Sequence, residues 1–261
     1  MQKIFGKKPT FEFLKIYKSS PEVYKIYKIY LKKNISKNFI NMFKELNLLK
    51  YIEFKDPVEL DSLTQEKNQG IIILYEEIKQ PEIVLKNNIK RPKKNLDTKQ
   101  ILKNYPGIYV LTDRIQDPHN LGSIIRASEA LGAMGIFITG KGAKINHTVQ
   151  KVSTSSFLYL PCFQIQNAMN LIQEAKKQNY YILATTTKRS EKSIQLQEIY
   201  KIPKQNRYVI LMGSENDGLK DILLKNSDYW IEIPLLGKTE SLNVNQALSI
   251  ILYELIQYVY F

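Results

Sequence analysis

Cysteine and histidine are scarce in this chain of 261 residues. A single cysteine, Cys162, excludes an intramolecular disulfide, which fits a reducing compartment. The two histidines, His119 and His147, have no cysteine partners at the spacing of zinc ligands, so no metal site is expected. No run of apolar residues approaches the length of a membrane span, and the N-terminus has no signal-peptide core. We therefore expect a cytoplasmic protein with no membrane partner.

Acidic residues are few relative to basic ones. The chain has 38 Lys and Arg against 25 Asp and Glu, which gives a formal net charge of +13 at pH 7. Such an excess favours a polyanionic partner, either nucleic acid or an anionic membrane, although a lysine-rich composition alone produces the same surface charge. Apolar residues make up 44%, enough to bury a core, and the length suits one large domain or two modest ones.

The sequence divides into two regions with a polar stretch between them. In residues 1–85, apolar spacing and β-branched or aromatic runs alternate, which predicts a small α/β domain. Its expected helices cover residues 9–18 and 39–46, and its expected strands cover residues 23–31 and 70–75. Residues 86–104 include the run KRPKKN and few apolar residues. We expect them to form a basic linker, either a solvated connector or one that touches phosphates.

Residues 105–261 alternate strand patterns with helix patterns, which is typical of a mainly parallel sheet with helices on both faces. Strands are expected at residues 108–111, 135–139, 181–184, 208–212 and 230–233, and helices at residues 123–133, 168–178 and 244–259. In such sheets, ligands bind beyond the carboxyl ends of the strands. The loops that follow these strands are therefore the places to look for chemistry.

The first of these loops reads DPHNLGSIIR over residues 117–126. The side chain of Asn120 can cap the helix that follows, and Gly122 lets a backbone or a ligand come close. Arg126 can bind a phosphate through two hydrogen bonds. An ordinary helix start with an exposed arginine has the same pattern, so this loop alone is only moderately specific.

Two later loops are as unusual as the first. Residues 211–219 read LMGSENDGL, in which the glycines around Glu215 allow backbone contact with a flat ligand such as adenine. Residues 233–244 read IPLLGKTESLNV and lead through Ser241 and Asn243 into the last helix, whose N-cap either residue can provide. Each loop alone is also compatible with an ordinary turn between a strand and a helix.

Taken together, in this order, the three loops resemble the signature motifs of the SpoU (TrmH-like) family of RNA ribose methyltransferases, within the SPOUT superfamily. The loops match Asn-x-Gly-x-x-x-Arg, Gly-x-Glu-x-x-Gly and Ile-Pro…Ser-Leu-Asn-Val in turn. The resemblance runs from about residue 108 to the C-terminus. Residues 4–6 and 68–71 resemble, more weakly, the ends of the substrate-binding domain of the bacterial 23S rRNA guanosine subfamily. Asn68, Asn216 and Asn245 depart from residues that are frequent there, which weakens any claim about the particular target.

The resemblance implies a fold and a site. The implied fold is α/β, with a knotted (trefoil) SPOUT domain of mainly parallel sheet over residues 105–261. A smaller α/β RNA-binding domain precedes it and resembles a ribosomal-protein-type fold, and the protein is expected to be a homodimer. The catalytic residues that the resemblance implies are Arg126, Asn120, Glu215, Ser241 and Asn243. The backbone groups that it implies for cofactor binding belong to Gly213, Ile233 and Leu242.

The implied reaction is S-adenosylmethionine-dependent methylation of a ribose 2′-hydroxyl, with a guanosine of 23S rRNA as the expected target. One alternative is a tRNA ribose methyltransferase of the same family. Another is a non-catalytic RNA-binding factor for ribosome assembly on the same fold, against which the retention of all three loops argues. The sequence lacks Gly-x-Gly-x-x-Gly, which disfavours a Rossmann-type methyltransferase.

Overall fold

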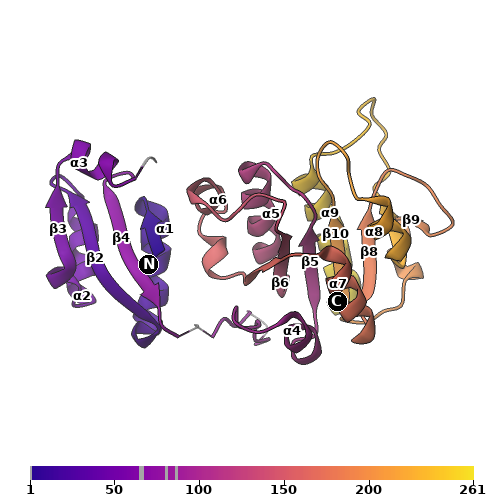
Figure 1. Cartoon of the computed structure of the whole chain (residues 1–261), viewed down its shortest axis with the longest axis horizontal. Helices are drawn as coiled ribbons and strands as arrows, with labels where there is room; N and C mark the ends of the chain where they lie inside the picture. Colours follow the sequence, from indigo (N-terminus) through magenta and orange to yellow (C-terminus); the bar gives the residue numbers. More distant parts are fainter. Residues whose placement is uncertain (1, 65–67, 80–81, 86–87) are drawn as a thin grey trace. The chain divides into compact units, whose positions relative to one another are not determined.

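The computed structural model describes residues 2–64, 68–79, 82–85 and 88–261. The chain folds as two compact units, Met1–Pro81 and Glu82–Phe261. The first unit contains four strands and three α-helices among its described residues (Figure 1). In chain order they are β1 (Gln2–Phe5), α1 (Lys7–Ser19), β2 (Tyr24–Lys32), α2 (Lys37–Glu45), β3 (Ile52–Lys55), α3 (Pro57–Ser62) and β4 (Ile71–Glu77).

The sheet of the first unit has the strand order β1-β4-β2-β3. β4 pairs antiparallel with both β1 and β2, whereas β3 pairs parallel with β2. Residues 23–31 were expected to form a strand because they are rich in β-branched and aromatic residues. In β2 a bulge after Ile26 interrupts the alternation of buried and exposed side chains, so Ile26 and Ile29 are both buried although they lie three residues apart. Phe13 of α1 packs on this face, with its ring centroid 5.0 Å from that of Tyr24.

The second unit alternates strands with helices. Its strands are β5 (Ile108–Thr112), β6 (Gly135–Thr139), β7 (Cys162–Ile165), β8 (Tyr181–Thr185), β9 (Ser193–Gln195), β10 (Tyr208–Met212) and β11 (Tyr229–Glu232). Its α-helices are α4 (Thr98–Asn104), α5 (Pro118–Ala130), α6 (His147–Val152), α7 (Ala168–Lys177), α8 (Asp221–Asn226) and α9 (Val244–Tyr260). Sequence patterns predicted the longer elements, but they missed β7, β9, α4, α6 and α8, each of seven residues or fewer. The helix α4 lies in the segment that was expected to be a linker.

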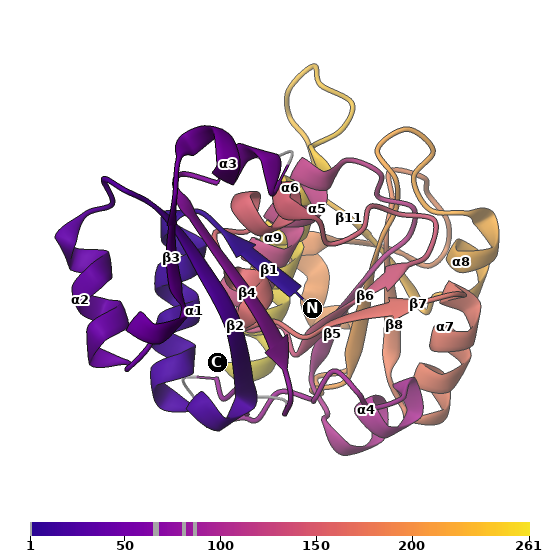
Figure 2. The ribbon, with the colours of Figure 1, turned by 60° about the vertical axis from the view of Figure 1, so that its left-hand side comes forward.

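All seven strands of this unit are parallel, in the order β7-β6-β5-β10-β8-β11-β9. The expected mainly parallel sheet is therefore confirmed. Helices α5, α6 and α9 cover one face of the sheet, and α7 and α8 cover the other (Figure 2). Since both faces are covered, the inner strands β5, β6 and β10 are almost entirely apolar, and every one of their residues is buried.

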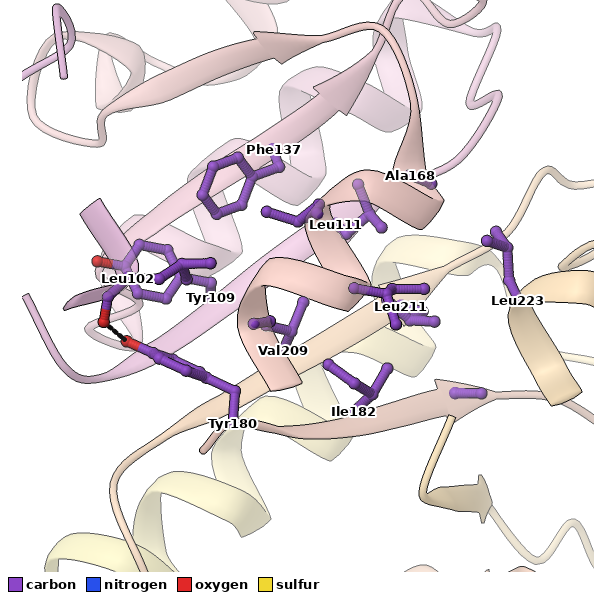
Figure 3. Close-up of a cluster of buried hydrophobic side chains, with 14 of the residues drawn as sticks. Leu102, Tyr109, Leu111, Phe137, Ala168, Tyr180, Ile182, Val209, Leu211 and Leu223 are labelled. Carbon is purple, nitrogen blue, oxygen red and sulfur yellow. Dashed lines mark hydrogen bonds between the residues drawn. The ribbon is translucent and has the colours of Figure 1, made fainter. Parts of the chain in front are cut away.

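The face beneath α7 holds a continuous apolar cluster (Figure 3). Tyr109 and Leu111 of β5 point into it because successive strand side chains alternate between the two faces. Its polar atoms have partners: the Tyr180 hydroxyl donates to the Leu102 carbonyl oxygen over 3.1 Å. Burial raises the pKa of the Tyr180 hydroxyl above its usual range, which keeps this hydroxyl neutral and able to donate. The packed face fixes the strands whose ends carry the loops.

The segment expected to be a basic linker is partly internal to the second unit. Arg91 has a side chain that is only 1% exposed. Its guanidinium donates to the carbonyl oxygens of Ala133 (3.0 Å), Tyr159 (2.8 Å) and Glu129 (3.2 Å), the last at the C-terminal end of α5. Burial lowers the pKa of Arg91 from its usual value, and the Glu129 carboxylate opposes that shift. The view of residues 86–104 as a merely solvated connector is therefore wrong at Arg91, although 86 and 87 lie outside the described residues.

The lone cysteine lies at the start of β7. Its thiol donates to the Leu160 carbonyl oxygen at 3.3 Å, and burial of the sulfur raises the pKa of Cys162 to about 12. In the part of the chain that the structure describes, no three His, Cys, Asp or Glu side chains lie close enough to hold a metal ion. No helix there is long and apolar enough to cross a membrane.

Candidate active site

Three loops leave the carboxyl end of the parallel sheet next to one another. They are the β5 loop (residues 113–117), the β10 loop (residues 213–219) and the β11 loop (residues 233–243). β10 pairs directly with β5, and β11 is separated from β10 only by β8. Because parallel strands end at the same edge, the three segments singled out in the sequence gather there. Figure 2 shows the β11 loop, in yellow, extending beyond the strand ends.

Side chains from all three segments meet in one hydrogen-bonded cluster, which we call the Asn–Glu–Asn cluster. The Asn120 amide nitrogen donates to Glu215 Oε1 over 2.5 Å. The Asn120 amide oxygen accepts from the amide nitrogen of Asn243 over 3.0 Å. Asn120 therefore uses both ends of its amide to join the start of α5 to the β10 and β11 loops.

Asn120 is free to make these bonds because another residue caps α5. The helix begins at Pro118, and Asp117 is its N-cap, accepting from the His119 amide at 2.9 Å. The prediction that Asn120 caps this helix is wrong, since the asparagine lies inside the first turn with its side chain directed away from the helix end. The alternative stated for the last helix is resolved in favour of Asn243, which caps α9 by accepting from the Asn245 amide at 2.9 Å.

Gly122 has a structural explanation. A Cβ atom at this position would lie 2.8 Å from the Cβ atom of Val152 and 3.1 Å from the Val149 carbonyl oxygen. The glycine therefore permits close packing of α5 on α6, rather than the approach of a ligand. This packing fixes the helix that carries Asn120.

The β10 loop is folded tightly back on itself. Ser214 and Gly218 form a bridge, in which the Gly218 amide donates to the Ser214 carbonyl oxygen at 2.9 Å. Gly218 has a φ of +63°, a left-handed conformation that glycine adopts without a steric penalty. At Gly213, a Cβ atom would lie 2.2 Å from the carbonyl carbon of Gly218, so no other residue fits there without opening the loop. Glu215 lies exposed at the tip and is held by Asn120.

The β11 loop has the opposite character. Residues 234–241 are all exposed, and Leu236 is fully exposed. Among the described residues, no backbone amide from Leu235 to Leu242 donates a hydrogen bond. The loop is tied to the rest of the unit through Asn243 at its end. Ser241, one of the expected site residues, lies in this exposed stretch, and its hydroxyl makes no hydrogen bond to any described residue of the cluster.

Arg126 is the remaining expected catalytic residue. It lies on the third turn of α5 and is exposed. Within the described residues, its guanidinium has neither an ion-pair nor a hydrogen-bond partner, unlike those of Arg91 and Arg114. Of the five expected catalytic residues, the structure thus connects Asn120, Glu215 and Asn243 directly, while Arg126 and Ser241 are exposed without partners.

Arg114 is a residue that the motif search missed. It follows β5 directly, and its guanidinium bonds to Asp113, Asp217 and Gly218 at 3.0, 3.0 and 3.1 Å. The signal in the sequence was a charged pair, Asp113-Arg114, immediately after a buried strand, where both groups need partners. No motif that we recognised included it.

A comparison with known protein families identifies the family of this chain. Residues 107–253 match the profile of the SpoU rRNA Methylase family. The chain belongs to that family. The match covers all three loops, so this SpoU-family chain is an RNA methyltransferase with the motif positions retained.

Individual proteins extend the likeness beyond the matched region. The chain is 25% identical over 256 residues to a putative TrmH family tRNA/rRNA methyltransferase, YacO, of Bacillus subtilis, covering 96% of this chain and 93% of the relative. Among solved structures, an AdoMet-bound rRNA methyltransferase from Sinorhizobium meliloti superposes with a TM-score of 0.73. It is 20% identical, and the match covers 99% of this chain and 88% of that one. A TrmH/SpoU tRNA modifying enzyme from A. aeolicus is 27% identical with a TM-score of 0.52, covering 62% of this chain and 80% of its own.

Proposed function

We propose that this SpoU-family protein transfers a methyl group from S-adenosylmethionine to a ribose 2′-hydroxyl of RNA, with a guanosine of 23S rRNA as the target. The observation that carries the proposal is the Asn–Glu–Asn cluster. It joins the three motif loops at the edge where parallel sheets bind ligands. Asn120, at the centre of the cluster, lies on α5, the helix that also carries the exposed Arg126.

Three backbone N–H donors in the β10 and β11 loops suit the adenosine end of the cofactor. Within the described residues, the backbone amides of Gly213, Ile233 and Leu242 have no hydrogen-bond partner, and Gly213 is buried. A buried backbone amide normally bonds to protein, water or a ligand, so Gly213 is suited to hold a polar heterocycle, and the half-buried Ile233 and Leu242 offer two further donors beside it. S-adenosylmethionine supplies the transferable methyl group together with its own leaving group, so the reaction needs no metal.

Arg126 fits the role of a group that binds and orients the ribose. An arginine guanidinium stays protonated in proteins, so its contribution is electrostatic: it stabilises charge on the attacking oxygen and positions the adjacent phosphate. Since no residue in the described part of the chain pairs with its guanidinium, its donors are available for RNA. Glu215, oriented by Asn120, places a carboxylate at the same edge, and Ser241 lies on the exposed loop that completes the site.

Two observations favour rRNA over tRNA. The rRNA methyltransferase from S. meliloti matches this chain from end to end, whereas the A. aeolicus tRNA enzyme matches only 62% of it. Residues 86–104 also contain seven Lys and Arg residues against one Asp, which is the densest basic segment of the chain. We propose that the exposed lysines of this segment and the first unit contact the backbone of a structured rRNA. RNA affinity should then fall steeply with salt.

We also propose that the second unit forms the knotted SPOUT topology and dimerises through α9. Leu248, Ile251, Leu252 and Leu255 of this helix are buried within the protomer, so they are not available to a partner. The support for a dimer comes from the opposite side of the helix. There Ile250 and Tyr253 are 41% and 50% exposed, and the terminal Phe261 is 87% exposed. Light scattering at micromolar concentration tests this, and a monomer would contradict it.

The decisive experiment measures methyl transfer from radiolabelled S-adenosylmethionine to 23S rRNA and to tRNA, followed by mapping of the modified ribose. We expect incorporation into 23S rRNA at one nucleotide. Arg126→Ala should lose turnover by about a hundredfold or more while S-adenosylmethionine binding, followed by calorimetry, stays near that of the wild type.

The matched control is Arg189→Ala, which removes an exposed arginine outside the three motifs. If both variants lose activity equally, the effect reflects net charge and the role of Arg126 is wrong. Methylation of a base, or of tRNA alone, would contradict the ribose or the rRNA part of the proposal.

A further inference from the structure

Arg114 lies in a turn that the surrounding structure holds from several sides. Its backbone has a φ of +59°, a left-handed conformation that is unfavourable for a residue with a side chain. The Arg114 amide donates to Thr139 Oγ1 at the end of β6 over 3.1 Å, and the preceding Asp113 amide donates to the Met212 carbonyl oxygen of β10 over 2.8 Å. The turn is therefore anchored to both strands that flank β5.

The side chain of Arg114 extends this anchoring across to the β10 loop. All three guanidinium nitrogens donate: Nε to Asp113, Nη1 to the Asp217 carboxylate and Nη2 to the Gly218 carbonyl oxygen. The Arg114 side chain is only 18% exposed and that of Asp113 only 6%. The Arg114 charge therefore neutralises a nearly buried carboxylate, and a neutral residue at position 114 would leave that carboxylate without a counter-ion.

The β10 loop is consequently held at two separate places. Arg114 holds the returning part of the loop, at Asp217 and Gly218, while Asn120 holds its tip at Glu215. Both residues come from the segment that follows β5. Arg114 thereby fixes the part of the loop that packs against Gly213, whose backbone we assigned to the cofactor.

We propose that Arg114 is a positioning residue for the methyl-transfer site. It acts through the β10 loop and touches neither the RNA nor the cofactor. This inference rests on the proposed function, because the expected changes are in cofactor binding and methyl transfer. The contact between Arg114 and Gly218 can also be tested without that function, by hydrogen exchange of the Gly218 amide, which is hydrogen-bonded inside the loop.

Two substitutions separate positioning from folding. Arg114→Gly removes the side chain at a position whose backbone conformation suits glycine. Arg114→Lys keeps a positive charge beside Asp113, but an ammonium group cannot bridge Asp217 and Gly218 in the same planar arrangement. We expect Arg114→Lys to melt near the wild-type temperature yet bind S-adenosylmethionine about tenfold more weakly, with a fall in kcat on saturating rRNA. Arg114→Gly should bind S-adenosylmethionine still more weakly and should also melt at a lower temperature, because Asp113 then lacks its counter-ion.

Asp217→Asn tests the same contact from the other side. Its carboxylate is 71% exposed, so the substitution should leave folding intact and weaken cofactor binding by a few-fold. In an Arg114→Lys background this effect should shrink, because both changes remove one interaction. Lys201→Gln, which breaks the exposed ion pair with Glu198, is the matched control and should change neither quantity.

The inference fails if Arg114→Lys and Arg114→Gly fold and bind S-adenosylmethionine as the wild type does. It also fails if the loss of cofactor affinity in Arg114→Lys only parallels a drop in its melting temperature. A wild-type protein that binds no S-adenosylmethionine would instead reject the proposed function. In that case hydrogen exchange still decides about Arg114: faster exchange of the Gly218 amide in Arg114→Gly supports the contact, and unchanged exchange overturns it.

Discussion

The β10 loop and the β11 loop leave the same edge of one sheet and carry two motifs of one family, yet they are held in opposite ways. The β10 loop bonds within itself and is fixed by Arg114 and Asn120. The β11 loop makes no internal backbone bond and is fixed at its end by Asn243. The site therefore combines a loop held by its own backbone hydrogen bonds with a loop whose backbone amides, from Leu235 to Leu242, donate to no described residue.

This difference assigns the loops different energetic roles. A loop that is already held in place, such as the β10 loop, contributes to binding without a cost in conformational entropy. A loop that becomes ordered on binding loses conformational entropy. We expect the β10 loop to set affinity for the small cofactor. The β11 loop should close only when its partners have arrived, which would link binding of the cofactor and the RNA to completion of the site.

The largest difference between the two loops is expected for a matched pair of glycine-to-alanine substitutions, one in each loop. At Gly213 an added Cβ would overlap the Gly218 backbone, so Gly213→Ala should lower the free energy of unfolding by about 2 to 3 kcal/mol and abolish cofactor binding. At Gly237 nothing lies within 4 Å of an added Cβ, so Gly237→Ala should leave both unchanged. Denaturant unfolding and calorimetry measure these effects. Equal effects at the two positions would contradict the difference between the loops.

A substitution at Asn120 should break its hydrogen bond to Glu215 of the β10 loop. In Asn120→Asp, a carboxylate replaces the amide nitrogen that faces Glu215 at 2.5 Å, and we expect turnover at pH 8 to fall by roughly ten- to a hundredfold. Steady-state kinetics of the variant measure this fall, and Asn120→Ala should show a smaller loss because it leaves no second carboxylate beside Glu215. Turnover equal to that of the wild type in Asn120→Asp would reject the contact.

Hydrogen exchange should sharpen the comparison without any substitution. The Gly218 amide is bonded to the Ser214 carbonyl oxygen and should exchange more slowly than the amides of residues 235–242, which donate to no described residue. Adding S-adenosylmethionine should slow exchange mainly in the β11 loop, because only that loop has order to gain. Slowing confined to the β10 loop would reverse our assignment.

The smallest effect is expected at the exposed tip of the β11 loop. Leu236 is fully exposed, so Leu236→Ser should change the free energy of unfolding by less than about 0.5 kcal/mol. Leu224→Ser, at a position that is 2% exposed, should by contrast destabilise the protein by several times that amount. A measurable loss of stability at Leu236 would show that the loop packs on the protein in solution.

The sequence predicted the parallel sheet well because buried strands such as residues 108–112 and 208–212 are continuously apolar. It also predicted three members of the site, since Asn120, Glu215 and Asn243 stand in motifs whose strands end at one edge. It could not show which of them touch, because that depends on the strand order β5-β10-β8-β11, which no local pattern encodes.

The partners of Arg91 and Arg114, which both lie outside the motifs, were missed for a related reason. Arg91 stands in a run of basic residues that is typical of a solvated segment, and its partners Glu129 and Tyr159 lie 38 and 68 residues away. Arg114 likewise finds Asp217 and Gly218 across more than 100 residues. Composition predicts that a charged side chain is exposed. Only the tertiary structure shows where a partner that is distant in the sequence holds such a side chain in the interior.

The chemistry of the lone cysteine makes this chain suited to site-specific labelling. With the pKa of Cys162 raised to about 12, almost none of its thiol is ionised at pH 7.5, and maleimide reagents react with the thiolate. An engineered cysteine at the fully exposed tip, Leu236→Cys, would have an ordinary thiol and should be modified selectively. A single fluorophore placed there would report the movement of the β11 loop in real time in an otherwise natural protein.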